Sequence, residues 1–144
     1  WFDSIESRLS HAMFGIPAVK GIEFGAGFDM VDARGSEYND PFRMNGDRVV
    51  TTTNNNGGIN GGITNGMPVL MRLAVKPISS IYKKQESVNM FKGVNEDLVI
   101  EGRHDPAIIH RARIVADSLV AVVIYDIMAG RYGTDYFAGS KEDK

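Results

Sequence analysis

Three clusters of residues in this chain carry groups that bind anions. The first is a run of asparagine and glycine at 54–66, the second is Lys76-Pro77-Ile78-Ser79-Ser80, and the third is Arg103-His104-Asp105. Glycines leave backbone N–H groups uncovered, lysine and arginine supply positive charge, and serine donates an O–H. Together these groups predict a site for a small phosphorylated or carboxylated ligand.

Each cluster also has an ordinary structural explanation. The run at 54–66 has the composition of a flexible linker, although the apolar strands expected on both sides favour a rigid loop. It fits no Walker or Rossmann spacing. The Lys-Pro-x-Ser-Ser segment is a common turn sequence, and Asp105 is a good helix N-cap. His104 is, on the same basis, a hydrogen-bonded histidine.

Metal and thiol chemistry have little support in the sequence. The chain has three histidines and no cysteine, and its histidines have no partner at metal-ligand spacing. We interpret His11 and His110 as structural residues. No Gly-x-Ser-x-Gly nucleophile motif is present.

The first half of the chain is expected to contain one helix and several strands. Apolar residues recur at helical spacing from Phe2 to Met13, with a capping-box start at Asp3 and a stop at Gly15. A polar loop is expected over residues 32–47. Strands are expected after Pro17 up to Phe24 and over residues 48–53, 68–75, 87–91 and 98–100, of which the strand at 68–75 is apolar on both faces and therefore central.

A long helix is predicted over residues 107–129. Asp105 suits its N-cap, Pro106 its first position and Gly130 its end. Its wide apolar face predicts packing on more than one side. Charged residues argue against a membrane span; they are Arg111, Arg113, Asp117 and Asp126.

The composition fits one globular domain. The chain has 144 residues, of which 43% are hydrophobic and 24% charged, which excludes a disordered chain. A net charge of −2 gives no general attraction to nucleic acid or acidic lipid. The absence of cysteine permits a cytoplasmic location. Because the chain opens at Trp1, we expect it to be a piece of a longer protein.

Five separated motifs in register resemble the C-terminal part of chorismate synthase, and the similarity covers nearly the whole chain. The motifs are residues 16–28, Gly35-Ser36-Glu37, residues 54–66, residues 76–80 and Gly102-Arg103-His104-Asp105-Pro106. The resemblance implies an α+β fold with antiparallel strands packed on long helices, as part of the β-α-β sandwich of that family. It assigns residues 1–138 to the C-terminal part of the domain and leaves residues 139–144 as a flexible tail.

The resemblance also implies an activity. Chorismate synthase is a lyase of the shikimate pathway that converts 5-enolpyruvylshikimate 3-phosphate to chorismate and phosphate by 1,4-elimination. The family requires reduced FMN, which lends electron density as phosphate leaves and whose N5 helps to remove the C6 proton. Whether the enzyme reduces its flavin itself with NADPH or relies on another reductase stays open. The family is cytoplasmic and works as a homotetramer.

Individual roles follow from the same resemblance. Arg103 is expected to contact FMN or substrate, and Asp105 to assist proton removal at N5. A carboxylate beside a helix N-terminus is stabilised as the anion, which favours a proton acceptor over an acid. No metal is expected. The expected FMN contacts are Pro17, Ala18, Gly61, Lys76, Pro77, Ile78, Ser79 and Ser80.

The chain departs from the family pattern at three positions, and the resemblance covers only the C-terminal part of the family. Asp117 stands where the family signature has glutamate, Ala107 where cysteine is common, and Asn56 where alanine or serine is typical. The family's two catalytic histidines lie in its N-terminal half, so we expect residues 1–144 alone to be inactive.

Two alternatives remain from the residues themselves: a non-catalytic module that binds FMN or a phosphoanion, and a structural domain for oligomer assembly.

Overall fold

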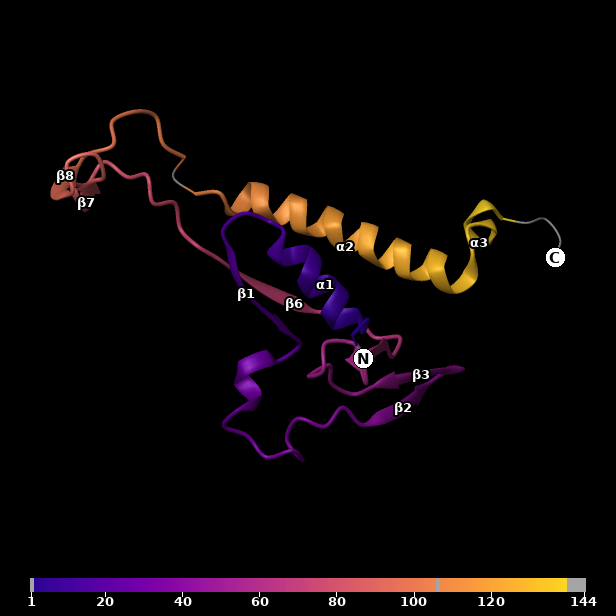
Figure 1. The fold of residues 1–144 in the computed structure, drawn as a ribbon. Helices are drawn as coiled ribbons and strands as arrows, with labels where there is room; N and C mark the ends of the chain where they lie inside the picture. Colours follow the sequence, from indigo (N-terminus) through magenta and orange to yellow (C-terminus); the bar gives the residue numbers. More distant parts are fainter. Residues whose placement is uncertain (1, 106, 140–144) are drawn as a thin grey trace.

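The computed structural model describes residues 2–105 and 107–139 and mixes helices with antiparallel strands (Figure 1). The described strands form four two-stranded antiparallel ribbons, β1–β6, β2–β3, β4–β5 and β7–β8. This confirms the α+β class. In chain order the elements are α1 (Ile5–Phe14), β1 (Val19–Phe24), the 3₁₀ turn η1 (Gly27–Met30), β2 (Phe42–Asn45), β3 (Arg48–Thr51), β4 (Ile59–Asn60), β5 (Ile63–Thr64), β6 (Met71–Val75), β7 (Gln85–Asn89), β8 (Val94–Leu98), α2 (Ile109–Tyr132) and α3 (Asp135–Ala138).

Helix α1 begins one residue later than its sequence pattern predicts. The Ser4 hydroxyl, rather than the Asp3 carboxylate, accepts a hydrogen bond of 3.1 Å from the Ser7 N–H and caps the helix. The backbone explains the difference, because the Ile5 N–H is already bonded to the Gly62 carbonyl at 3.0 Å and fixes where the first turn starts. The predicted stop at Gly15 is confirmed.

The core lies around α1. One group of buried side chains joins the C-terminal half of α1 to β1 and α2 through Met13, Val19 and Ala116. A second group joins the N-terminal half to the small β4–β5 ribbon through Leu9 and Ile59. Helix α1 therefore joins the β1–β6 ribbon, the β4–β5 ribbon and α2.

Leu9 gives a direct test of this core. It is fully buried, so Leu9→Ala should leave a cavity and lower the free energy of unfolding by about 3 kcal/mol. Phe14→Ala serves as the control, because Phe14 lies on the same helix and is 52% exposed; it should cost less than about 1 kcal/mol. Urea unfolding of the two variants checks this. Equal losses would mean that Leu9 does not anchor the core.

Helix α2 is displaced along the chain from the predicted 107–129. It begins at Ile109 and has no side-chain cap, because the Asp105 carboxylate pairs with Arg111 instead of capping the first turn. The predicted first position, Pro106, lies outside the described residues. The helix continues through Gly130 and ends before Gly133, whose φ of 80° is incompatible with a right-handed turn.

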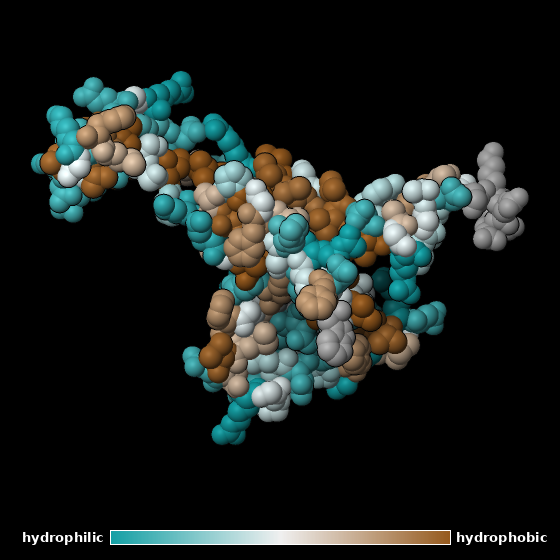
Figure 2. All heavy atoms as spheres, viewed as in Figure 1, coloured by the Kyte–Doolittle hydropathy of each residue, from teal (hydrophilic) through white to brown (hydrophobic). Residues whose placement is uncertain are grey.

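The prediction that α2 is packed on more than one side is not met within the described residues. One face of α2 lies against α1 and the β1–β6 ribbon. The other carries exposed apolar side chains, including Ile114 at 67% and Val122 at 62%. Figure 2 shows hydrophobic atoms along this helix. No helix among the described residues is long and apolar enough to cross a membrane. Residues 2–105 and 107–139 leave this apolar face of α2 uncovered.

The strands differ from prediction in three places. Strand β6 was expected to be central but pairs, among the described residues, with β1 alone, and its side chains alternate between half-buried and exposed. The loop expected over 32–47 contains β2, which pairs with β3. The strand expected at 98–100 lies earlier, as β8, which closes the projecting β7–β8 arm (Figure 1). Helix α3 was not predicted, and residues 140–144 of the predicted tail lie outside the described chain.

Candidate functional site

Two of the expected FMN contacts meet at one end of the β1–β6 ribbon. The Lys76 N–H donates a hydrogen bond of 2.7 Å to the Ala18 carbonyl, beside the pair formed by Val19 and Val75. Ala18 has a φ of 71°, a conformation that side chains disfavour, and a bulge follows it in β1. A strained backbone held by its neighbours is common at binding sites. The motif Pro17-Ala18 therefore lies directly against the first residue of Lys76–Ser80.

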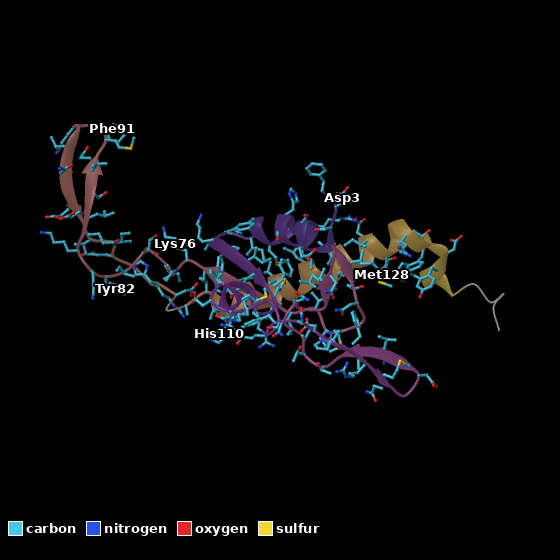
Figure 3. All side chains as sticks on the ribbon, turned by 90° about the horizontal axis from the view of Figure 1, so that it is seen from below. Asp3, Lys76, Tyr82, Phe91, His110 and Met128 are labelled. Carbon is cyan, nitrogen blue, oxygen red and sulfur yellow. The ribbon has the colours of Figure 1, made fainter. Side chains whose placement is uncertain are left out.

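Tyr82, two residues after Ser80, contacts the Arg103 cluster. Figure 3 shows Tyr82 between Lys76 and Phe91, which lies in the β7–β8 arm. Its hydroxyl donates to the Gly102 carbonyl, and its ring meets the His104 ring edge-on with centroids 4.8 Å apart. His104 Nε2 also lies 3.2 Å from the Ile100 carbonyl oxygen. The ordinary interpretation of His104 as a hydrogen-bonded histidine is thus confirmed. The sequence analysis missed Tyr82, and no motif there marks it.

Asp105 sits just before α2 in an ion pair. Its carboxylate accepts hydrogen bonds from both terminal nitrogens of Arg111, at 2.8 and 3.4 Å, and the side chain is about half exposed. The expectation that Asp105 is the N-cap is wrong, because an ion pair to a residue inside the first turn holds it away from the N–H groups. Arg103 lies two residues earlier and is exposed. The cluster therefore presents a guanidinium and a carboxylate to solvent.

An apolar hollow of about 200 Å³ adjoins this end of the molecule. Val19 and Val75, the neighbours of Ala18 and Lys76, form one side of it, and Ile109 and Ala112 from the start of α2 form another. Its lining is mostly apolar but includes the charged side chains of Arg113 and Asp117, as in sites for a largely apolar ligand with a few polar groups. Among residues 2–105 and 107–139, no cluster of metal-ligating side chains occurs.

Gly61 lies elsewhere. It forms, with Gly62, the turn between β4 and β5, and the Gly62 carbonyl accepts the Ile5 N–H at the start of α1. Pro17 and Ala18 follow the other end of α1, which is 10 residues long and spans about 15 Å. Tyr82, two residues after the second cluster, thus contacts the third cluster, and the first cluster lies at the opposite end of α1 from Pro17-Ala18.

The asparagine- and glycine-rich run is a rigid loop. The Ala26 N–H donates to the Asn55 carbonyl at 2.7 Å, and the Leu70 N–H donates to the Gly57 carbonyl at 3.1 Å, so the loop bonds to chain on both sides. Gly57 and Gly58 are buried. The flexible-linker alternative is therefore wrong for this part of the run.

The backbone N–H groups at the start of this loop are already bonded to an anionic group of the chain itself, the carboxylate of Asp40. The Asp40 carboxylate accepts the N–H groups of Asn55 and Asn56, each at 2.8 Å, and the Thr53 hydroxyl at 2.7 Å. Partial burial alone would raise the pKa of Asp40, but these hydrogen bonds outweigh it and lower the pKa below its ordinary 3.8. Their contribution to stability is present above pH 3.8 and is lost as the pH falls through the lowered pKa.

Comparisons with known proteins agree on one family. A model of the family described as chorismate synthase matches residues 1–129. The chain is 49% identical over 126 residues to a chorismate synthase of Dehalococcoides mccartyi strain BAV1, covering 88% of this chain and 35% of that protein. It is 48% identical over 127 residues to one of Methanobrevibacter smithii, covering 88% of this chain and 35% of that protein.

A solved structure gives the same result at the level of the fold. A structure titled "Crystal Structure of Chorismate Synthase" matches with a TM-score of 0.72 and 30% identity, covering 92% of this chain and 32% of that one. The chain spans about a third of the length of the relatives it matches. With a family model over residues 1–129 and this agreement in fold, the chain belongs to the chorismate synthase family.

Proposed function

We propose that this chain forms part of an enzyme that converts 5-enolpyruvylshikimate 3-phosphate to chorismate and phosphate by 1,4-elimination, with reduced FMN as cofactor. The observation that carries the proposal is the contact between two family motifs: the Lys76 N–H, at the start of residues 76–80, bonds to the Ala18 carbonyl of Pro17-Ala18. A site for a flavin phosphate needs cations and donors close to an apolar surface, and this end of the molecule has both.

The residues at this end have distinct tasks in the proposed site. Lys76 and Ser79 are exposed and supply a positive charge and an O–H donor for the flavin phosphate. Arg103, before α2, supplies a second positive charge for the flavin or for an anionic group of the substrate. The hollow lined by Val19, Val75 and Ile109 would exclude water from one side of a bound ring.

Reduced FMN, when bound, would supply the electron density that allows phosphate to leave. Asp105 is proposed to accept a proton near the flavin, and its ion pair with Arg111 keeps the carboxylate oriented. Each of these residues binds or orients the ligand or accepts a proton. By resemblance, the histidines of the reaction come from the family's N-terminal half. We therefore propose that residues 1–144 alone are inactive.

We also propose that the exposed face of α2 is covered in a homotetramer. Ile114, Val122 and Tyr125 are exposed on this helix. Apolar patches of this kind commonly mark contact surfaces in assembled proteins.

The test is a hybrid enzyme in which this chain replaces the matching segment of the Dehalococcoides mccartyi relative. With reduced FMN under anaerobic conditions, the hybrid should form chorismate and release phosphate in equal amounts, and this chain alone should form neither. A folded hybrid that binds FMN, seen by flavin fluorescence quenching, but makes no chorismate would support the alternative of a non-catalytic binding module. A folded hybrid that does not bind FMN would contradict the proposal.

Lys76 offers a test of cofactor binding. In the hybrid, Lys76→Ala should raise the Kd for FMN about 10- to 100-fold, because a charge-assisted hydrogen bond to phosphate is worth about 1.5–3 kcal/mol. Lys92→Ala is the control, since Lys92 is exposed at the β7–β8 turn, away from the β1–β6 ribbon. Fluorescence titration measures both. An unchanged Kd for Lys76→Ala would remove Lys76 from the site.

A further inference from the structure

Asp40 lies in none of the family motifs discussed above. Its carboxylate is the centre of a cluster of hydrogen bonds. Its Oδ1 accepts the Asn55 N–H at 2.8 Å and the Thr53 hydroxyl at 2.7 Å, while its Oδ2 accepts the Asn56 N–H at 2.8 Å. Thr53 also donates to the Asn39 carbonyl at 3.2 Å. One carboxylate thus uses both oxygens to bind the beginning of the asparagine- and glycine-rich loop.

The geometry of this cluster requires a carboxylate. Three donors converge on two oxygens, and an ionised carboxylate is acceptor-only with room for all of them. An asparagine at position 40 would place an NH₂ group against a backbone N–H, so at least one donor would lose its partner. The lowered pKa of Asp40 fits the same arrangement.

The loop that Asp40 holds is built into the backbone on both sides. Gly25 and Gly57 approach so closely that a Cβ on Gly25 would lie 2.5 Å from the Gly57 nitrogen. Asn54 Nδ2 donates to the Pro68 carbonyl at 2.8 Å. A shift of this loop would therefore have to move the chain after β1 and the chain before β6 as well.

The same loop leads directly into the ribbon that carries Gly61. The Asn65 N–H donates to the Gly58 carbonyl at 3.0 Å, and Asn65 Nδ2 donates to Asn60 Oδ1 at 2.6 Å, which closes β4 and β5 around the Gly61 turn. Gly61 has a φ of 59° and open space around it. The turn is thus free to meet a ligand, and its place is set by the loop behind it.

We propose that Asp40 is a positioning residue for cofactor binding: it fixes the loop at 53–58 and, through it, the Gly61 turn. The inference rests on the proposed function and on the resemblance, which assigns the Gly61 turn to FMN although it lies at the other end of α1 from Ala18 and Lys76. Asp40 itself touches no cofactor in this scheme. Its carboxylate accepts the N–H groups of Asn55 and Asn56, which would otherwise be free to bind an anionic ligand. The loop therefore has its shape before any ligand binds.

The test is Asp40→Asn in the hybrid enzyme, with two readouts. Hydrogen exchange measured by mass spectrometry should become at least about tenfold faster in the peptide over residues 53–58 and stay unchanged in α1 and α2. The Kd for FMN should rise about tenfold, while kcat at saturating FMN stays within about twofold. A purely structural role would lower the folded fraction without changing the Kd of the molecules that fold.

Two further variants keep the test decisive. Asp47→Asn is the matched control, because Asp47 is exposed in the turn between β2 and β3; it should change neither readout. Thr53→Val keeps the carboxylate and removes one donor, so it should raise the Kd about twofold even if Asp40→Asn does not fold.

The outcomes separate this inference from the proposed function. Unchanged exchange at 53–58 in Asp40→Asn would overturn the inference whatever the activity. Faster exchange with an unchanged Kd for FMN would show that the loop does not position the cofactor site, and would also overturn it. Loss of FMN binding in the unsubstituted hybrid would instead overturn the proposed function, while the exchange result would still report on the loop.

Discussion

Asp105→Asn in the hybrid enzyme is expected to lower kcat about 100-fold and to leave the Kd for FMN within about twofold. The substitution keeps the shape of the side chain but removes the negative charge that would accept a proton. Asp105 lies before α2, about half exposed and paired with Arg111, so its loss should cost little stability. Steady-state assays of chorismate formation, with FMN titrated by fluorescence, measure both quantities.

Two variants on the same helix distinguish a proton acceptor from a structural residue. Asp126, also on α2, pairs with Arg8 of α1 and does not line the hollow, so Asp126→Asn should leave kcat within about twofold. Arg111→Ala breaks the ion pair but keeps the Asp105 carboxylate, so its effect should be much smaller than that of Asp105→Asn. If Arg111→Ala lowered kcat just as far, Asp105 would act through Arg111 and not as the acceptor.

Gly25→Ala should lower the free energy of unfolding by about 4 kcal/mol. Gly25 has a φ of 57°, which costs a residue with a side chain about 1–2 kcal/mol, and the added Cβ would overlap the Asn55 carbonyl. The clashing atoms are backbone held on both sides, so relief requires movement of the loop itself and adds about 1–3 kcal/mol. Urea unfolding of the hybrid measures the loss.

Gly46→Ala is the matched control for this prediction. Gly46 has a φ of 61°, close to that of Gly25, but no atom lies within 4 Å of its would-be Cβ. Only the conformational cost of about 1–2 kcal/mol remains. The difference between the two variants therefore measures the close packing of the loop against the end of β1, and equal losses would show that the two segments are not in contact.

The sequence was sufficient for elements whose signal is local. Helical spacing of apolar residues located α1 and most of α2, β-branched residues located β3, and alternating apolar residues located β6. The predicted helix ends were less accurate, because neighbouring residues have similar capping preferences. Ser4 and Asp3 are both good caps, and the bond from Ile5 to Gly62, which no local pattern contains, selects Ser4.

The residues of the candidate site were found by type and order, but their grouping was not. Lysine, serine, arginine and glycine in those motifs were enough to indicate an anionic ligand and to suggest the family. Tyr82 could not be found in this way, because a tyrosine contributes to the site only through its contacts with Gly102 and His104.

By itself, then, the sequence determined the fold class and the family and predicted an anionic ligand, since these depend on residue type and short-range order. Only the tertiary structure decided which N–H groups are free. Asp40 lies 15 residues before Asn55 and fills the donors that looked available, and α1 keeps Gly61 away from Lys76. A hydrogen bond needs its partner within about 3 Å, and a partner brought there by folding leaves no mark in the spacing of the chain.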